Sequence, residues 1–423
     1  MIQITDKFQC CGCEACVQSC PKQCISFNED NEGFRYPKVD ESSCVECGAC
    51  QRTCPVLNQS NPRQPISFFA SKCLDDSVRQ ASSSGGVFTL LAQDVVHRGG
   101  VVFGARFNEH WEVIHSYTET IGGIADFQTS KYVQSRIGDS FRHAKEFLKQ
   151  GRVVLFSGTP CQIAALRLFL QHDYDNLLTI DIVCHGVPSP KVWQMYIETL
   201  KDNARTGHNI VSHPLNSFIK GSNAFNISED DLKIERISFR DKSLGWKKYS
   251  LILSFSKAFA NDKISSVSLA NIHSEDPYMR TFLSNVNLRL SCFQCPAKEG
   301  KGESDITLGD FWGIDRLMPE YDDGKGVSLV ILNTQRGVNE FGRLPVEKIK
   351  VSKKDALAYN PAYLSSSKPN PYRSRFFKKL GSGNNNIINL MNNANQPSIH
   401  VRFWRKLRHY MNLIRLLIYA KAV

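Results

Sequence analysis

The sequence has no hydrophobic stretch approaching the ~18 uncharged apolar residues that a membrane span requires. Its first nine residues are polar and contain no apolar segment of the kind found in secretory signals. These two absences argue against a membrane-spanning or secreted protein. We therefore expect a protein that is made and kept in the cytoplasm.

Acidic residues are absent after Asp355. The segment beyond it contains eleven Lys and Arg residues, which equals the formal net charge of +11 of the whole chain. Residues 1–355 are therefore formally neutral. This distribution argues against a uniformly basic nucleic-acid-binding protein and indicates a basic C-terminal appendage.

Cysteine, by contrast, is abundant, with 15 residues in 423. Reducing conditions in the cytoplasm disfavour structural disulfides, so metal binding or catalysis accounts better for so many thiols. Ten of them lie between Cys10 and Cys54. The other five are Cys73, Cys161, Cys184, Cys292 and Cys295. This uneven distribution predicts a metal-binding module near the N-terminus.

Two runs of these cysteines follow the pattern C-x2-C-x2-C-x3-C-P of bacterial proteins with two 4Fe-4S clusters. In this arrangement the fourth cysteine of each run binds the cluster of the other run. We predict cluster 1 on Cys10, Cys13, Cys16 and Cys54, and cluster 2 on Cys20, Cys44, Cys47 and Cys50. Structural zinc is the alternative, but it needs only four ligands. Cys11 and Cys24 lie outside the pattern and are expected to pack nearby, and residues 25–39 are expected to form a hairpin between the runs.

A different pattern begins after a proline-containing linker at residues 55–65. Ser82–Gly86 precedes an apolar-periodic stretch at residues 87–96, which predicts a helix capped by serine. The free amides and the dipole at such a helix end would suit a phosphate, for example that of a flavin. Capping alone explains the residues equally well, so both interpretations stay open at this point.

Residues 152–156 and 177–183 are predicted to be buried strands, each followed by a turn and a helix. A strand–helix–strand–helix order implies a parallel pair with a right-handed crossover. Ligands of such sheets bind outside the carboxyl ends of the strands. Because Cys161 and Cys184 each follow a strand end, we expect them to be neighbours at this edge.

A further CxxC motif, Cys292–Cys295, supplies two more thiols. With Cys161 and Cys184 they would make four, enough for a third 4Fe-4S cluster. The alternative is two inert cysteines and an unrelated CxxC that binds zinc or nothing. From about residue 233 the chain is rich in strand-like alternation and aromatic residues. These aromatic residues suit either an ordinary core or a platform for an isoalloxazine ring.

Several stretches resemble the beta-subunit family of coenzyme F-420 (deazaflavin) hydrogenases and dehydrogenases. They are Ser82–Gly86, Ser130–Ser135, Phe156–Gln162, Cys184–Pro190, Phe239–Trp246, Cys292–Cys295 and Asp305–Gly313, within about residues 66–335. The resemblance implies an FAD-binding α/β core with an integral 4Fe-4S cluster. It therefore favours the flavin-phosphate interpretation and the third cluster. In such a protein the flavin converts between hydride transfer and single-electron steps.

The resemblance also suggests site residues. The candidates for cofactor binding are Ser82, Ser83, Ser84, Gly85, Gly86, Tyr132, Gln134, Ser135, Gly158, Thr159, Asp310 and Trp312. His185 and Lys131 are candidates for polarising the flavin or donating a proton. A structural role is the alternative for each of these two.

The C-terminal segment follows Asn-rich, linker-like stretches at residues 381–386 and 392–397. Residues 401–420 are patterned as an amphipathic helix with a basic side. Such a helix can lie on the inner face of an anionic membrane or dock on a partner protein. Packing against its own domain is the alternative.

These observations predict a chain of mixed α+β and α/β class with four parts. A two-cluster ferredoxin domain occupies residues 1–60, and an α/β flavin-binding core with a mixed sheet follows. The core is divided into residues 66–150, with the flavin phosphate site, and residues 151–335, with the cluster and substrate site. A basic tail with a C-terminal helix occupies residues 336–423.

The leading hypothesis is an iron–sulfur flavoprotein oxidoreductase. It would pass electrons between 4Fe-4S clusters and FAD, to or from a small conjugated organic substrate, with a ferredoxin or similar redox protein as partner. The resemblance implies a deazaflavin or another conjugated compound as substrate, since members of the family act on either. Relatives with this domain order also occur beside polysaccharide synthesis genes, which leaves the choice between the two open. The alternatives are a non-catalytic electron-transfer subunit and an accessory protein of surface polysaccharide synthesis.

Overall fold

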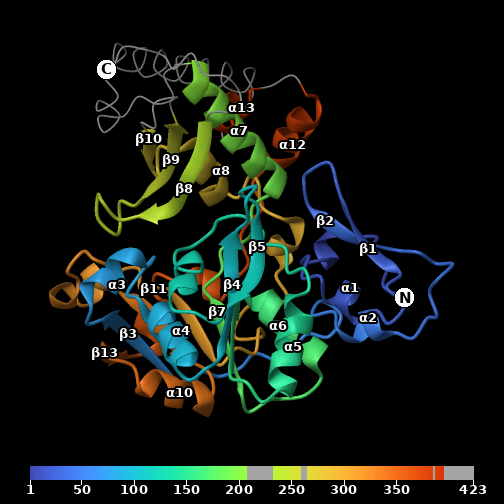
Figure 1. Ribbon diagram of the computed structural model, residues 1–423, viewed down its shortest axis with the longest axis horizontal. Helices are drawn as coiled ribbons and strands as arrows, with labels where there is room; N and C mark the ends of the chain where they lie inside the picture. The colour runs from blue at the N-terminus through green and yellow to red at the C-terminus, as the bar shows by residue number, and fades with distance from the viewer. Residues whose placement is uncertain (207–231, 259–263, 384–385, 395–423) are drawn as a thin grey trace, which may run out of the picture.

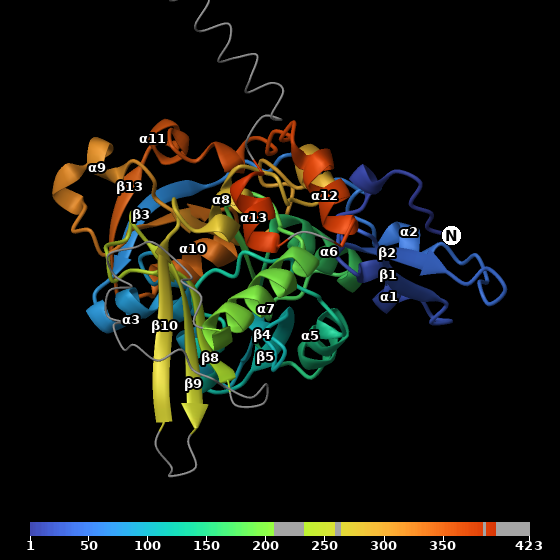
Figure 2. The same ribbon diagram turned by 90° about the horizontal axis from the view of Figure 1, so that it is seen from above.

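The computed structural model describes residues 1–206, 232–258, 264–383 and 386–394. Figure 1 shows a small N-terminal module beside a large sheet covered by helices, with a second sheet above it. Figure 2 shows the N-terminal module at the end of the molecule opposite β13 and β3.

The N-terminal module is built from short elements. They are η1 (Lys7–Gln9), α1 (Ala15–Ser19), β1 (Ile25–Glu29), β2 (Arg35–Val39) and α2 (Ala49–Arg52). β1 and β2 pair antiparallel, which confirms the hairpin predicted between the cysteine runs. The interior consists of cysteines with a few aliphatic residues such as Ile2 and Ile25. A module of this size buries too little apolar surface to be stable alone, and metal binding is a usual remedy.

The core contains an eight-stranded mixed sheet in the order β13-β3-β12-β11-β7-β6-β4-β5. Its strands are β3 (Ser67–Cys73), β4 (Val101–Phe107), β5 (Val113–Thr118), β6 (Val154–Gly158), β7 (Leu177–Ile182), β11 (Ile306–Asp310), β12 (Ser328–Leu332) and β13 (Val346–Val351). The central strands β11, β7, β6 and β4 run parallel, whereas the outer pairs are antiparallel. The predicted mixed sheet and its parallel pair β6–β7 are thereby confirmed.

Successive residues of the central strands face two different helical layers. On β6, Leu155 packs in the layer of α4 (Val87–His97) and α10 (Gln335–Gly342). Phe156 packs in the opposite layer, with α5 (Ser140–Lys149) and α6 (Pro160–Leu170). Cys11, Cys13 and Ala15 join this second layer. The N-terminal module is therefore docked on the α5–α6 side of the sheet.

A second, antiparallel sheet has the order β10-β9-β8, with β8 at Leu232–Asp241, β9 at Ser250–Ala258 and β10 at Ile264–Ile272. It shares one hydrophobic cluster with α7 (Pro190–Thr206), α8 (Pro277–Leu283), α12 (Arg373–Gly381) and α13 (Ile387–Asn392). Phe34 and Tyr36 of the N-terminal module belong to the same cluster. The short remaining elements are α3 (Asp76–Ala81), η2 (Gly122–Asp126), η5 (Leu290–Gln294), α9 (Ile314–Leu317), η6 (Pro319–Tyr321), α11 (Lys353–Leu357) and η7 (Pro361–Tyr363).

The Asn-rich stretch at residues 381–386 separates α12 from α13. Asn386 caps α13 by accepting hydrogen bonds from the amides of Ile388 and Asn389. The amphipathic segment predicted at residues 401–420 lies outside the described residues. Within the described part of the chain, no helix is both long enough and apolar enough to cross a membrane.

Candidate functional site

The four cysteines predicted for cluster 2 are brought together in the structure. Cys20, Cys44, Cys47 and Cys50 line one small cavity. Cys47 is exposed, so this cavity lies at the surface. Cys24 lines the same cavity, with its Sγ 3.4 Å from that of Cys20, which is the neighbouring position expected for it.

The cysteines predicted for cluster 1 are all buried. Burial raises the pKa of the Cys16 thiol, and the nearby Cys10 and Cys54 thiolates raise it further. Thiolates repel one another in a buried site, so several thiols can lose their protons there together only if bound metal ions neutralise the negative charge. This donor set therefore fits an iron–sulfur cluster. The two sets lie close together, because the charge of Cys50 in the other set also raises the pKa of Cys54.

A third group of cysteines lines a separate cavity. Cys161, Cys184, Cys292 and Cys295 all face it, although the CxxC motif is more than a hundred residues from the first two. Cys161 lies in the first turn of α6 beyond β6, and Cys184 follows β7, so the carboxyl edge of the parallel pair does gather them. The CxxC motif arrives from η5.

The surroundings of this cavity also fit a cluster. The N-terminus of α6 favours a thiolate at its first turn. Burial raises the pKa of Cys184 to about 12, and the Lys298 ammonium opposes that rise. Lys298 Nζ donates to the carbonyl oxygens of Cys184 and Ala362 at 2.7 and 2.6 Å. Within the described residues no three His, Cys, Asp or Glu side chains converge on a single ion; each cubane thiolate binds a different iron atom.

Cys11 connects the two neighbouring cysteine sites. It lines the third cavity as a fifth thiol. A hydrogen bond with Cys13 and burial raise the pKa of Cys11, whereas its contact with Cys161 lowers it. The cysteines of cluster 1 therefore lie directly beside those of the third cavity.

A second group of side chains surrounds Arg240, near the end of β8. The guanidinium Nη2 donates to Asp310 Oδ1 at 3.0 Å and to the Ser83 carbonyl oxygen at 3.2 Å. Trp246 Nε1 donates to the same Asp310 oxygen at 3.1 Å. The guanidinium carbon lies 3.9 Å from the centre of the Tyr249 ring. We call Arg240, Asp310, Trp246, Trp312, Tyr249 and Tyr132 the Arg240 cluster.

The Arg240 cluster combines a buried cation with flat aromatic surfaces. Trp246 and Trp312 are stacked, with ring centres 5.2 Å apart and planes 5° from parallel. The charges of Arg240 and Asp310 act on the pKa of Tyr132, which burial raises. Nε of Arg240 is buried and has no hydrogen-bond partner in the part of the chain that the structure describes. A ligand oxygen would satisfy this nitrogen.

The serine segment meets the Arg240 cluster, but it does not cap α4 as predicted. α4 begins after Gly86, whose φ of +89° is left-handed, and no side chain caps it. Ser83 Oγ instead accepts from the Ser130 amide at 2.7 Å, and Ser84 Oγ donates to the Val327 carbonyl oxygen at 2.7 Å. The serine-cap prediction is therefore wrong, because the glycine turns the serines toward neighbouring strands and loops. The backbone amides in the first turn of α4 therefore donate to no side-chain cap, and this leaves them available to an anion.

Lys242 fixes this segment from the other side. Its Nζ donates to the carbonyl oxygens of Arg79, Ser84 and Lys325 at 2.7, 2.8 and 2.9 Å. Burial lowers the pKa of Lys242 to about 7. Sequence reasoning missed Arg240, Lys242, Trp246 and Tyr249, although Arg240, Lys242 and Trp246 fall inside a stretch that it had selected.

The predicted cofactor residues are divided between the two sites. Tyr132, Asp310 and Trp312 belong to the Arg240 cluster, and the segment Ser82–Gly86 meets it through the Ser83 carbonyl oxygen. Gln134 and Thr159 line the cysteine cavity instead. Ser135 accepts from Gln162 Nε2 at 2.9 Å near that cavity, and the backbone of Gly158 passes the same glutamine.

Two known families match separate parts of the chain, one in the N-terminal module and one in the core. Residues 9–58 match the 4Fe-4S dicluster domain. Residues 151–355 match the C-terminal part of the beta subunit of coenzyme F420 hydrogenase/dehydrogenase. A segment that makes up a little less than half of the chain is therefore similar to this beta-subunit family. The resemblance recognised in the sequence is therefore confirmed, and so is the dicluster domain.

One solved structure similar to this chain is that of the F420-reducing NiFe hydrogenase complex from Methanosarcina barkeri, a xenon derivative. The sequence identity is 15% and the TM-score is 0.40, over 78% of this chain and 91% of that chain. No curated protein matches the chain.

The two candidate catalytic residues lie at different places. His185 lines the cysteine cavity, with Nε2 2.6 Å from Asn285 Oδ1, and burial lowers its pKa. Lys131 Nζ donates to the carbonyl oxygens of Asp126 and Gln128 at 2.5 and 2.8 Å. Burial lowers the pKa of Lys131 to about 7.

A row of rings connects the cysteine cavity with the Arg240 cluster. The centre of the His185 ring lies 5.2 Å from that of Phe282. Phe282 in turn stacks on Tyr132 at 4.8 Å. The two sites are therefore neighbours, separated by one phenylalanine.

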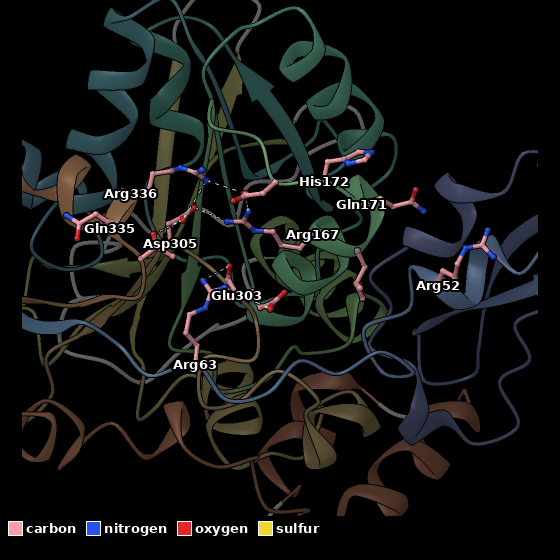
Figure 3. A pocket seen from close by; sticks show the side chains of 12 residues that line it. Arg52, Arg63, Arg167, Gln171, His172, Glu303, Asp305, Gln335 and Arg336 are labelled. Carbon is pink, nitrogen blue, oxygen red and sulfur yellow. Dashed lines mark hydrogen bonds and ion pairs between the residues drawn. The ribbon is translucent and has the colours of Figure 1, made fainter.

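A larger cavity, of about 820 Å³, lies at the opposite edge, beside the amino ends of β7 and β11. Figure 3 shows Arg63, Arg167 and Arg336 pointing toward acidic side chains, whereas Arg52 stands apart from them. Arg167 donates to Asp173 at 2.7 Å and to the buried Asp305 at 3.1 Å. The charges of Arg167 and Arg336 are thus paired with acidic groups of the cavity wall.

Proposed function

We propose that the chain is an iron–sulfur flavoprotein that moves electrons between a redox partner and a small conjugated organic compound. The partner, a ferredoxin or similar protein, would meet the exposed edge at Cys47. The organic compound, a deazaflavin or another, would react at FAD held by the Arg240 cluster. FAD can accept or donate a hydride and can also accept or donate single electrons. It could therefore link the organic compound, which reacts by hydride transfer, to the clusters, which carry single electrons.

The order of the sites in space carries this proposal. Cys47 is exposed, the cluster 1 cysteines are buried, and Cys11 leads from them to the third cavity. The rings of Phe282 and Tyr132 then lead to Arg240. An arrangement that runs from the surface to a buried cation between aromatic rings suits electron delivery better than iron storage or a structural role.

The third cavity would hold a 4Fe-4S cluster through Cys161, Cys184, Cys292 and Cys295. Four thiols converge there from two strand ends and a 3-10 helix, and Lys298 adds a positive charge. His185 would orient the cavity wall through Asn285 rather than act on a flavin.

The flavin would bind with a phosphate near the start of α4 and its ring against the Arg240 cluster. The uncapped α4 terminus, the unpartnered Nε of Arg240 and the stacked tryptophans support this placement. Lys131 remains the candidate proton donor, because an ammonium with a pKa of about 7 exchanges protons readily at neutral pH. Residues 1–60, 66–150, 151–335 and 336–423 would be the four functional parts of a cytoplasmic protein.

The family favours a second candidate, a subunit that only transfers electrons within a larger assembly. Anaerobic purification of the full chain followed by iron and flavin analysis separates the two. We expect about twelve iron atoms, in three clusters of four, and one FAD per chain. An absence of flavin after reconstitution would reject the flavoprotein, and iron near eight per chain would reject the third cluster.

A further inference from the structure

The Arg289 guanidinium lies wholly buried where the N-terminal module meets the core. Arg289 directly precedes η5, which carries Cys292 of the third cavity. Its side chain reaches across the interface to the first cysteine run. It therefore stands between the cluster 1 cysteines and the third cavity.

Every direct contact of this guanidinium is with backbone, amide, ring or thiol groups. Nε donates to the Cys10 carbonyl oxygen at 2.7 Å, and Nη2 lies 3.4 Å from Cys10 Sγ. Nη2 also donates to the Arg35 carbonyl oxygen at 3.0 Å, and Nη1 donates to Gln134 Oε1 at 3.1 Å. The Tyr36 ring covers one side, with its centre 4.3 Å from the guanidinium carbon.

No carboxylate pairs with Arg289 among the residues that the structure describes. Burying a guanidinium without an opposite charge is costly, so stable proteins normally provide an anion. Cys10 Sγ lies 3.4 Å from Nη2 of Arg289, Cys11 is the next residue of the same run, and Cys292 lies in η5, which directly follows Arg289. The anions available to Arg289 are therefore the cysteine thiolates on both sides of the interface.

The shape of the cysteine run is fitted to this side chain. Gly12 has a left-handed φ of +69°, and a Cβ there would lie 2.8 Å from Arg289 Nη1. The same Cβ would lie 2.5 Å from Gln134 Nε2, which donates to the Cys11 carbonyl oxygen. A side chain at this left-handed position would be strained and would have to displace one or both of these groups.

We propose that Arg289 is the counter-charge for cluster 1 and for the third cysteine site, and that it sets their reduction potentials. It is a positioning residue: it acts through Cys10 and the adjoining thiolates and takes part in no bond change. A fixed positive charge stabilises the reduced, more negative state of an iron–sulfur site, so it raises the potential. Two sites that share one cation would both stay reducible by the same donor. The inference rests on the proposed function only for the third site.

The test compares three variants of the full chain, purified without oxygen. Arg289→Gln removes the charge, Arg289→Lys keeps it without the planar fork, and Arg280→Gln changes an exposed arginine on α8 as the matched control. The readouts are the iron content and the midpoint potential of each cluster signal in a titration followed by electron paramagnetic resonance. Catalytic activity is not needed.

We expect the potentials of cluster 1 and of the third cluster to become more negative in Arg289→Gln, to recover in part in Arg289→Lys, and to stay unchanged in Arg280→Gln. Unchanged potentials at full iron content in Arg289→Gln would overturn the inference. So would a loss of cluster iron from both Arg289 variants, because lysine retains the charge. A wild-type iron content near eight would reject the third cluster while leaving the expected shift at cluster 1 unaltered.

Discussion

Arg373 of α12 and Glu32 of the β1–β2 turn form a two-point ion pair that joins the end of the described chain to its beginning. Nη1 lies 2.9 Å from Oε1, and Nη2 lies 2.5 Å from Oε2. Ser189 Oγ donates to the Glu32 carbonyl oxygen at 2.5 Å. The hairpin between the two cysteine runs is thus fixed to the core, which keeps the distance between the cluster sites constant.

Replacing Arg373 by Ala is expected to loosen the N-terminal module. The arginine is almost completely buried, so Glu32 would lose its partner in a largely dry contact, at a cost of about 1–3 kcal/mol. The apparent melting temperature should fall, and protease should cut the hairpin sooner. Lys378→Ala, an exposed change on the same helix, is the control. Equal protease resistance in both variants would show that the ion pair does not hold the module.

Replacing Cys292 by Ala is expected to lower the iron content from about twelve to about eight atoms per chain, since one of three clusters loses a ligand. The control is Cys73→Ala. Cys73 is buried on β3, where its Sγ accepts from the Asp75 amide at 3.4 Å, and it lines none of the cysteine cavities described above. Iron analysis of both proteins decides. The same iron content in both would mean that Cys292 is not a ligand.

Replacing Arg240 by Ala is expected to weaken FAD binding. The variant would lose the hydrogen bond that we place between Arg240 Nε and the flavin, and one charged hydrogen bond is worth about 1.5–3 kcal/mol, so affinity should fall roughly 10- to 150-fold. The comparison is Arg236→Ala, an exposed change on the same strand. Titration of flavin-depleted protein with FAD gives both affinities. Identical affinities would place the flavin away from the Arg240 cluster.

Asp181 should make stability depend on pH. Burial raises its pKa to about 7, and Oδ1 has no partner in the described part of the chain. The folded state therefore holds a proton that the unfolded chain releases above pH ~4. The contribution of Asp181 to stability should fall as the pH rises from about 4 to 7 and then level off, by at most about 4 kcal/mol. Asp181→Asn should melt with a smaller loss between pH 5.5 and 7.5; an identical loss would exclude this assignment.

The sequence predicted the parts of the sites that depend on local spacing. Both ferredoxin-type cysteine sets follow from a repeat, and Cys161 and Cys184 meet because parallel strand ends share an edge. The start of α4 was misjudged, since a left-handed Gly86 overrides the capping tendency of the serines before it. Arg240 and Arg289 could not be recognised. A single arginine gains its role from groups distant in sequence, such as Asp310 for one and Cys10 for the other.

The central claim is that electrons reach the flavin site only by way of the third cysteine cavity. The most direct test mixes the reconstituted full chain with a reduced ferredoxin, a donor too large to reach a buried flavin, and follows cluster and flavin absorbance over time. In the wild type we expect the clusters to be reduced first and the flavin afterwards. In Cys292→Ala the ferredoxin-type clusters should still be reduced while the flavin stays oxidised. Flavin reduction at the wild-type rate in that variant would contradict the account.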